Sequence, residues 1–370
     1  MNTERLLQTF QELVSIDNPS LFEREICDYI SLYLNNLGFT VYEDDVASKI
    51  MGNSGNLYCF LEGDESLEPL LFSAHMDVIE PSYGKQAIIH ENGNITSDGT
   101  TILGADDLAG VSVILEAVTT IKENNFQHRP IELVFFVGEE IYGIGSKVFD
   151  YSLLKSKEAY ILDSSGEVGS AAYKAPTLIS FDVTVLGKSG HTGFHSNKII
   201  HSIAITSEAI TKIKMGQIDE ESTCNMGVIQ GGLAPNIIPY SCKVKGEIRS
   251  HSHKKAIEIL NEISNIFHST GEKYNAVVNF ESKVQIKAYE TPLNHPVVER
   301  FKNVCGDLNI NPAFYPTFGG SDNNNLEEHE INGLVLANAM HNPHSCEETS
   351  SISELEKITN IVIALMRNKD

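Results

Sequence analysis

Acidic residues and histidines follow or adjoin apolar stretches at several places in the chain. The segments are Leu71–Asp77, Gly104–Asp107, Val137–Glu140 and Ile161–Asp163, and a further one, Asn342–Ser345, lies far downstream. Together they offer two histidines and several carboxylates but no cysteine pair. These donors suit a catalytic site for Zn²⁺ or a similar divalent ion, in which an open position holds water.

The first of these segments can supply one ligand and its support. His75 ends an expected strand, so its ring can leave the sheet edge and reach a metal. Asp77 can accept a hydrogen bond from the other ring nitrogen and so fix the tautomer. The alternative is a strand-end histidine beside a surface aspartate, because a two-residue match arises easily by chance.

Asp106 and Asp107 stand at the start of a helix expected over 107–122. Two adjacent acids at this position can simply cap the helix. Alternatively, one carboxylate bridges two cations, since two divalent ions about 3.5–4 Å apart require a shared anion.

Glu139 and Glu140 follow an apolar stretch over 131–137 that we expect to be a strand covered on both faces. Adjacent acids there repel each other and resist burial unless a cation compensates them. One of them can bind a metal while the other takes a proton from water.

Two further donors complete the candidate set. Asp163 repeats the pattern of an acid after an apolar strand, although this signal is weak by itself. His344 and His341 compete for the last ligand position, and we prefer His344 because Ser345 and Glu348 follow it.

Composition excludes some classes of protein. The chain has 370 residues, enough for two domains, and a net charge of −23. Nucleic acids and anionic membranes both attract basic proteins, so we expect neither as a partner. Six scattered cysteines indicate reduced thiols, and we find no signal peptide and no membrane-spanning stretch, so we expect a cytoplasmic protein.

The elements that must position these residues alternate as in an α/β layer fold. Expected strands are 40–44, 56–62, 69–74, 131–137, 160–162 and 333–338, and expected helices include 3–15, 107–122, 295–308 and one that ends at Arg367. Ser20–Glu23 and Ser351–Glu354 both match the capping-box pattern.

The pattern changes near Pro176. Strand 177–186, helix 197–214, strands 223–230 and 240–249, helix 252–269 and strand 276–284 follow in turn. This β-α-β-β-α-β order is typical of a ferredoxin-like sandwich. We therefore predict a small domain, 176–287, inserted into a metal-binding domain that comprises 1–175 and 288–370. Within the insert, His191, Asn236 and Arg249 could be ordinary loop and strand-end residues.

The motifs together resemble the M20 metallopeptidases, and within them the peptidase T branch of tripeptide aminopeptidases. They are His75-Met-Asp77, Asp98–Asp107, Gly138-Glu-Glu140, Asp163 and His344-Ser345, and Ser97–Asp107 is the most specific stretch. Gly190–Gly193, Gly231–Asn236 and Arg249–His251 are similar to the lid domain of that family, and Gly319–Asp322 to its return segment. The match covers essentially the whole chain in the right order.

This resemblance implies an α/β zinc-peptidase-like domain, a mixed sheet flanked by helices, with a ferredoxin-like α+β lid that also forms a homodimer. It implies two Zn²⁺ ions per subunit, with Co²⁺ or Mn²⁺ as possible substitutes. The implied ligands are Asp106 between both ions, His75 and Asp163 on one, and Glu140 and His344 on the other. Asp77 would orient His75, and Glu139 would be the general base and later the acid.

For the lid, the resemblance implies that His191 reaches the active site of a neighbouring subunit, and that Asn236 and Arg249 hold the polar end of a short peptide. The expected reaction is removal of the N-terminal residue of tripeptides. Dipeptidase, carboxypeptidase or N-acyl-amino-acid deacylase activity on the same site, and a non-catalytic peptide-binding protein, are the alternatives. One departure is Leu108, where the family often has Lys, and another is the polar run Asn323–Asn325.

Overall fold

The computed structural model describes residues 1–193 and 199–367. The chain forms two compact units. The first comprises 1–174, 290–317 and 321–370, and the second comprises 175–289 and 318–320. The predicted insert, 176–287, falls within the second unit, whereas the short return stretch 318–320 was not expected there.

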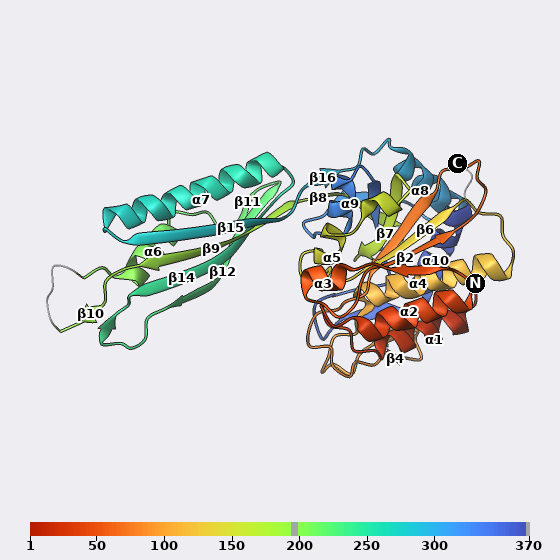
Figure 1. Cartoon of the computed structure of the whole chain (residues 1–370), viewed down its shortest axis with the longest axis horizontal. Coiled ribbons are helices and arrows are strands. Elements are labelled where there is room, and N and C mark those ends of the chain that lie inside the picture. The colour runs from red at the N-terminus through yellow and green to blue at the C-terminus, as the bar shows by residue number, and fades with distance from the viewer. Residues whose placement is uncertain (194–198, 368–370) are drawn as a thin grey trace. The chain divides into compact units, whose positions relative to one another are not determined.

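The first unit is built on a nine-stranded mixed sheet (Figure 1). Its order is β1 (Val41–Glu43), β2 (Leu57–Leu61), β6 (Ile131–Phe136), β3 (Leu70–His75), β7 (Glu158–Ser164), β18 (Asn332–Ala337), β8 (Ser170–Ala175) and β16 (Tyr289–Glu290), and β17 (Ala313–Pro316) pairs with β8. Strand β3 is parallel to both of its neighbours, β6 and β7, and β18 is parallel to β7. Four consecutive strands therefore end at the same edge of the sheet.

Apolar side chains cover both faces of this sheet. The larger core joins the sheet to α1 (Thr3–Val14), α2 (Arg24–Asn36), α4 (Ala105–Glu123), α8 (Pro296–Asp307) and α10 (Ile352–Arg367). Figure 1 shows α1, α2 and α4 gathered beside one another. The opposite face packs against Phe149, Leu326 and Ile331, near α9 (Asn323–Glu328). Burial on both faces explains why every residue of β3 and β6 is buried.

Shorter elements complete the first unit. They are α3 (Val46–Ile50), β4 (Ile88–Ile89), β5 (Asn94–Thr96), α5 (Ile144–Lys147), the 3₁₀ helix η1 (Tyr151–Leu153) and β19 (Thr349–Ser351). Strands β19, β5 and β4 form a separate three-stranded sheet.

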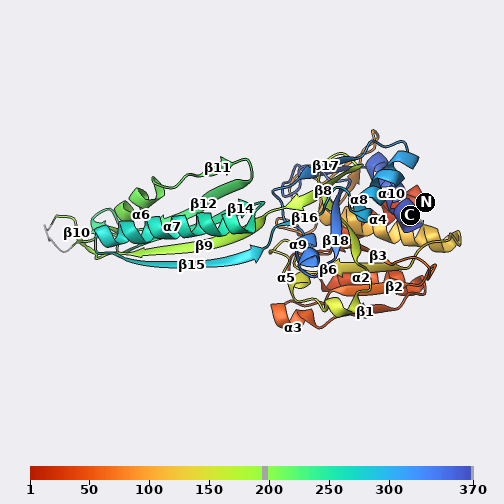
Figure 2. The ribbon, with the colours of Figure 1, turned by 90° about the horizontal axis from the view of Figure 1, so that it is seen from above.

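The second unit is an antiparallel sheet with helices on one face, seen from above in Figure 2. The strand order is β11 (Gly216–Asp219), β12 (Ser222–Gly231), β14 (Ser241–Ser250), β9 (Thr177–Leu186) and β15 (Val277–Ile286). Alternate residues of β9, from Ile179 to Val185, pack against α6 (Ser202–Ile210) and α7 (His253–Lys273). The expected ferredoxin-like order is present, with β11 and the small β10 (Gly190–His191) and β13 (Ile237–Ile238) pair added.

Two expectations about helix ends were wrong. Ser20 and Glu23 do not form a capping box, because Ser20 Oγ donates to Asp77 Oδ2 at 2.6 Å instead. Helix α6 spans Ser202–Ile210 rather than 197–214, and 197–198 lie outside the described residues. At the second predicted capping box, Ser351 Oγ accepts from the Glu354 amide at 3.3 Å, so the predicted cap of the last helix is confirmed. The Glu354 carboxylate accepts from Ser351 Oγ at 2.7 Å. Among the described residues, no helix has the length and apolar character needed to cross a membrane.

Candidate metal centre

The predicted ligands gather at the carboxyl edge of the large sheet. His75 ends β3, Glu140 follows β6, and Asp163 lies near the end of β7. Asp106 reaches the same edge from the start of α4, and His344 from the loop between β18 and β19. The parallel direction of the central strands thus collects residues that are far apart in the sequence.

The five residues form two groups that share one carboxylate. In one group, His75 Nε2 lies 3.2 Å from Asp106 Oδ1 and 3.7 Å from Asp163 Oδ1. In the other, His344 Nε2 lies 2.9 Å from Glu140 Oε2 and 3.3 Å from Asp106 Oδ2. Within each group the possible ligand atoms all lie within 4.8 Å of one another. Asp106 therefore directs one oxygen toward each group.

The charges of this cluster fit a pair of divalent cations. Burial raises the pKa of Asp163 to about 7, against the opposing effect of its hydrogen bond with His75. Hydrogen bonds to Asp106 and Glu140 raise the pKa of His344 to about 10. The carboxylates and imidazoles of this cluster thus stabilise positive charge among them. Bound cations would supply this positive charge instead, with one imidazole and two carboxylates for each.

Asp77 holds together the loops that carry the ligands. Its Oδ1 accepts from the amide of Glu139 at 2.9 Å, and its Oδ2 accepts from the amide of Glu140 at 3.1 Å. His75 Nδ1 lies 2.9 Å from the carbonyl oxygen of Asp77 and 3.5 Å from its carboxylate. The backbone carbonyl is therefore the nearer partner of the ring, and the carboxylate mainly fixes the chain after β6.

The two adjacent acids at the start of α4 have different surroundings. Asp107 belongs to neither group of possible ligands: its Oδ2 accepts from the His75 amide and its Oδ1 from Asn338 Nδ2, both at 3.2 Å. A Cβ at Gly110 would lie 2.3 Å from Asp107 Oδ1, so only glycine leaves room for this carboxylate. Both residues have non-helical backbone angles, so the regular helix begins after them rather than at 107 as expected.

Sequence reasoning missed several residues that support the site. Glu348 accepts from the amides of Gly104 at 2.6 Å and Asp106 at 2.9 Å, which fixes the turn before α4. Glu23 accepts from the amide of Gly138 at 3.0 Å. Burial raises the pKa of each of these two glutamates to about 7. From the sequence, Glu23 was named as part of a capping box and Glu348 as a neighbour of His344, but neither of these contacts was predicted.

The polar run after Asp322 also supports this edge. Ser146 Oγ donates to Asp322 Oδ1 at 2.5 Å, and Asn325 Nδ2 donates to Ser146 Oγ at 2.7 Å. Asn323 and Asn324 are buried as well. The polar residues that departed from the expected apolar pattern therefore anchor α9 to α5.

Glu139 lies beside the ligand groups without belonging to either of them. Burial, and next the charge of Asp163, raise the pKa of its carboxyl well above the usual value. His341 also lies outside both groups, because its Nε2 is 2.9 Å from the carboxylate of Glu354. Leu108 is fully buried in the core of the first unit.

The remaining predicted residues belong to the second unit. His191 is exposed on β10, and the amide of the next residue, Thr192, donates to the carbonyl of Asn236 at 3.2 Å. Arg249 lies near the far end of β14, where its Nη1 donates to the carbonyl of Phe318 at 2.7 Å. The eight residues of β14 before Arg249 span roughly 25 Å. Within one chain, Arg249 is therefore not brought together with His191 and Asn236.

Comparison with known proteins identifies the family. The model of the peptidase dimerisation domain matches residues 173–275, and that of peptidase family M28 matches residues 56–197. The Bacillus subtilis protein YqjE is 34% identical over 366 residues, which cover 99% of this chain and 98% of YqjE. The structure of aminopeptidase PepT from Bacillus cereus has a TM-score of 0.92 at 33% identity, and covers 99% of this chain and 98% of its own.

A tripeptidase from Staphylococcus aureus has a TM-score of 0.95 at 30% identity, again over 99% of this chain and 98% of its own. The chain therefore belongs to the M20 family of metallopeptidases, and it is an enzyme. Its similarity to PepT and to the tripeptidase assigns it to the peptidase T branch of that family.

Proposed function

We propose that this enzyme is a binuclear zinc aminopeptidase that removes the N-terminal residue of tripeptides. The observation that carries the proposal is the carboxylate of Asp106, whose two oxygens face two separate groups of possible ligands. The similarity to an aminopeptidase and to a tripeptidase supports the choice of substrate.

Five residues would hold the two cations. His75 and Asp163 would bind one, Glu140 and His344 the other, and Asp106 would lie between them. Zn²⁺ suits imidazole and carboxylate donors, and Co²⁺ or Mn²⁺ are possible substitutes. When bound, two such ions polarise a carbonyl group and lower the pKa of water toward about 7.

Glu139 would move the proton during hydrolysis. Its backbone is fixed by the bond from its amide to Asp77, so its carboxylate is held beside the ligand groups. Its carboxyl is buried beside Asp163, which raises its pKa and favours the uptake of a proton. Glu139 would take a proton from the attacking water and then deliver it to the leaving amine.

Recognition of the peptide would require two copies of the chain. The eight residues of β14 before Arg249 span roughly 25 Å, and Asn236 lies before this strand begins, so one copy cannot place both on one tripeptide. We propose that His191 and Asn236 come from the partner copy of a homodimer formed through the second unit. The match to the peptidase dimerisation domain supports this arrangement. His191 would stabilise the developing oxyanion.

We also propose that the enzyme acts in the cytoplasm, where a chain with six free cysteines and no disulfide keeps its thiols reduced.

The first experiment measures release of the N-terminal residue from a panel of small tripeptides by mass spectrometry. Each peptide is tested free and N-acetylated, with zinc-loaded enzyme and with chelator. Chelator-sensitive cleavage of the free peptides alone is the expected result. Cleavage of N-acetylated amino acids or of dipeptides, with none of tripeptides, would replace the proposed substrate class.

A mixing experiment tests the shared site. His191→Ala and Glu139→Gln should each be nearly inactive as homodimers. In a two-fold symmetric dimer, a mixed dimer keeps one intact site, so an equal mixture should recover up to about a quarter of wild-type activity. No recovery after exchange of subunits, shown by native mass spectrometry, would place His191 and Glu139 in sites of the same chain.

A further inference from the structure

Lys85 is a buried cation that lies beside the segments carrying the candidate metal ligands. It is 1% exposed, and its ammonium group donates to the carbonyl of Ile16 and, at 2.6 Å, to Asn18 Oδ1. Burial lowers the pKa of Lys85 to about 8, although nearby carboxylates act in the opposite direction. A methionine would fill such a space without the cost of desolvating a charge, so packing alone does not explain the lysine.

Asn18 connects Lys85 to the segment that follows β3. Its side chain is fully buried, and its Nδ2 donates to the carbonyl of Met76 at 2.5 Å. The carbonyl of Asn18 accepts from the amide of Val78 at 3.1 Å, so these two bonds lie on either side of Asp77. An ammonium group only donates hydrogen bonds. Lys85 therefore requires the amide oxygen of Asn18 to face it, which directs the NH₂ group toward Met76.

The stem of Lys85 packs against the turn before α4. Gly104 has a φ of +78°, and a Cβ added there would lie 3.0 Å from Lys85 Cε, so this turn lies directly on the side chain. The amides of Gly104 and Asp106 donate to Glu348, so the turn sets the position of the Asp106 carboxylate. One buried side chain thus reaches the segments that carry both His75 and Asp106, two candidate ligands of the same group.

We propose that Lys85 is a positioning residue for the cation held by His75, Asp106 and Asp163. It acts through the orientation of Asn18 and through its contact with the turn before α4. The inference rests on the proposed binuclear centre, because it concerns how tightly one of the two ions is held. Partners that orient metal ligands contribute about 10–100-fold to metal affinity, and Lys85 acts one step further away, so we expect an effect near the lower figure.

Two single variants and their combination separate positioning from stability. Lys85→Met removes the cation and leaves the buried Asn18 oxygen without its donor. Asn18→Leu removes the acceptor for Lys85 and also the donor to Met76. In the double variant both partners are apolar groups of similar size, which should restore much of the stability that a single variant loses. The orienting bond to Met76 is still absent from the double variant.

The measurements are the unfolding free energy of the dialysed protein in urea and its zinc affinity in competition with a chromophoric chelator. We expect Lys85→Met to bind one of its two zinc ions about tenfold more weakly than the wild type does. The double variant should stay as weak as the single variants while it regains stability, because both changes break the same chain of contacts. A merely structural role predicts that zinc affinity recovers together with stability.

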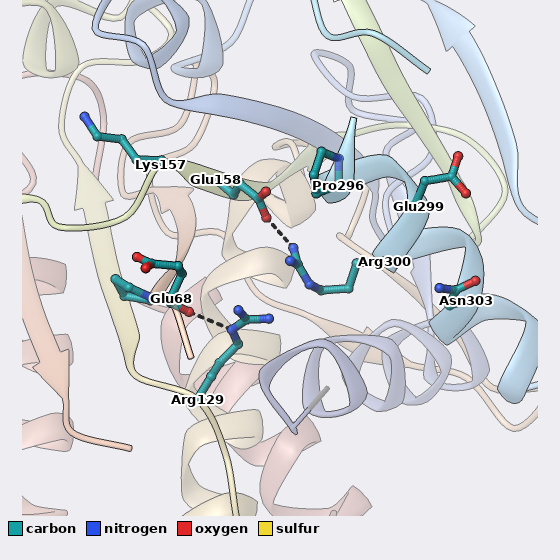
Figure 3. Close-up of a pocket in the computed structure, with 9 residues that line it drawn as sticks. Glu68, Arg129, Lys157, Glu158, Pro296, Glu299, Arg300 and Asn303 are labelled. Atoms are coloured by element: carbon teal, nitrogen blue, oxygen red, sulfur yellow. Dashed lines mark hydrogen bonds and ion pairs between the residues drawn. The ribbon is translucent and has the colours of Figure 1, made fainter. Parts of the chain in front are cut away.

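Arg129→Met is the matched control, because it removes another buried cation of the same unit. Arg129 is 1% exposed and lies just before β6, and Figure 3 shows it directed toward Glu68, whose carbonyl accepts from its Nε at 2.8 Å. The six residues of β6 separate it from Glu139 by roughly 20 Å. Arg129→Met should therefore lower the unfolding free energy and leave the zinc affinity unchanged.

Two results would overturn the positioning role. One is wild-type zinc affinity in Lys85→Met or in the double variant. The other is an equal loss of affinity in Arg129→Met, since the loss would then follow general stability. A wild type that takes up fewer than two zinc ions would instead contradict the proposed metal centre itself. No substrate is used, so the outcome is independent of whether tripeptides are cleaved.

Discussion

Replacing Glu139 by Gln separates proton transfer from metal binding at this site. The two adjacent acids after β6 differ in position: Glu140 belongs to a group of possible ligands, whereas Glu139 does not. Glutamine has nearly the same shape, and the backbone amide of residue 139 still donates to Asp77. The fold and the five ligands should therefore be retained, and only the proton acceptor is lost.

The expected size of the effect follows from that single loss. General acid–base catalysis contributes roughly 10²–10⁴-fold, so kcat should fall by that factor, or about 3–5 kcal/mol in activation free energy. The KM for a tripeptide should change little. Steady-state kinetics give both constants, and elemental analysis after dialysis gives the metal content, which we expect to stay at the wild-type value.

Glu140→Gln is the matched control, because it makes the same chemical change one residue away. It should lower the metal content as well as kcat, since it removes an anionic ligand. Near-native kcat in Glu139→Gln would refute the assignment of the general base. Equal loss of metal in both variants would show instead that Glu139 is itself a ligand.

Three further predictions follow from the contacts around the ligands. Asp106→Asn should reduce the metal content of the dialysed protein toward zero, because both groups lose a donor, whereas Asp163→Asn should remove only one ion; equal content in the two variants would contradict a shared carboxylate. Ser20→Ala removes the 2.6 Å bond to Asp77 and should weaken zinc affinity by about 10–100-fold in a competitive titration, while an unchanged affinity would show that Asp77 needs no such support. Burial lowers the pKa of Lys85 to about 8, below its usual value, so the unfolded chain holds more protons between pH 8 and 10 and stability should rise with pH across this window. Relative to Lys85→Met, the unfolding free energy of the wild type should gain on the order of 2 kcal/mol in urea denaturation from pH 8 to 10, and an equal slope in both proteins would mean that Lys85 titrates normally.

The positions of three candidate ligands at one edge of the sheet could be predicted because each depends on a local signal. An acid or a histidine directly after an apolar strand, as at His75, Glu140 and Asp163, is visible in a few residues. The ferredoxin-like order of the second unit was predictable for the same reason, since it depends on the periodicity of single elements.

The roles of the supporting residues could not be predicted, because their side chains form hydrogen bonds with residues far away in the sequence. Glu348 fixes the amides of Gly104 and Asp106, which lie more than two hundred residues earlier in the chain. Ser20 and Glu23 have the spacing of a capping box, but folding brings Asp77 and Gly138 within reach of their side chains instead. The spacing of residues within a four-residue stretch cannot show whether a side chain bonds to a local or a distant partner. The predicted capping box at Ser20–Glu23 was wrong for this reason.

The order of the ligands along the chain has a consequence for biosynthesis. The second unit is almost one continuous stretch, 175–289, whereas the first needs segments from both sides of it. His344, and with it the Asp106–Glu140–His344 group, is added only when nearly all of the chain has been made. A prematurely terminated chain could carry an intact second unit and still lack the second cation position. With the proposed two-ion site, full metal content would distinguish complete polypeptides from fragments.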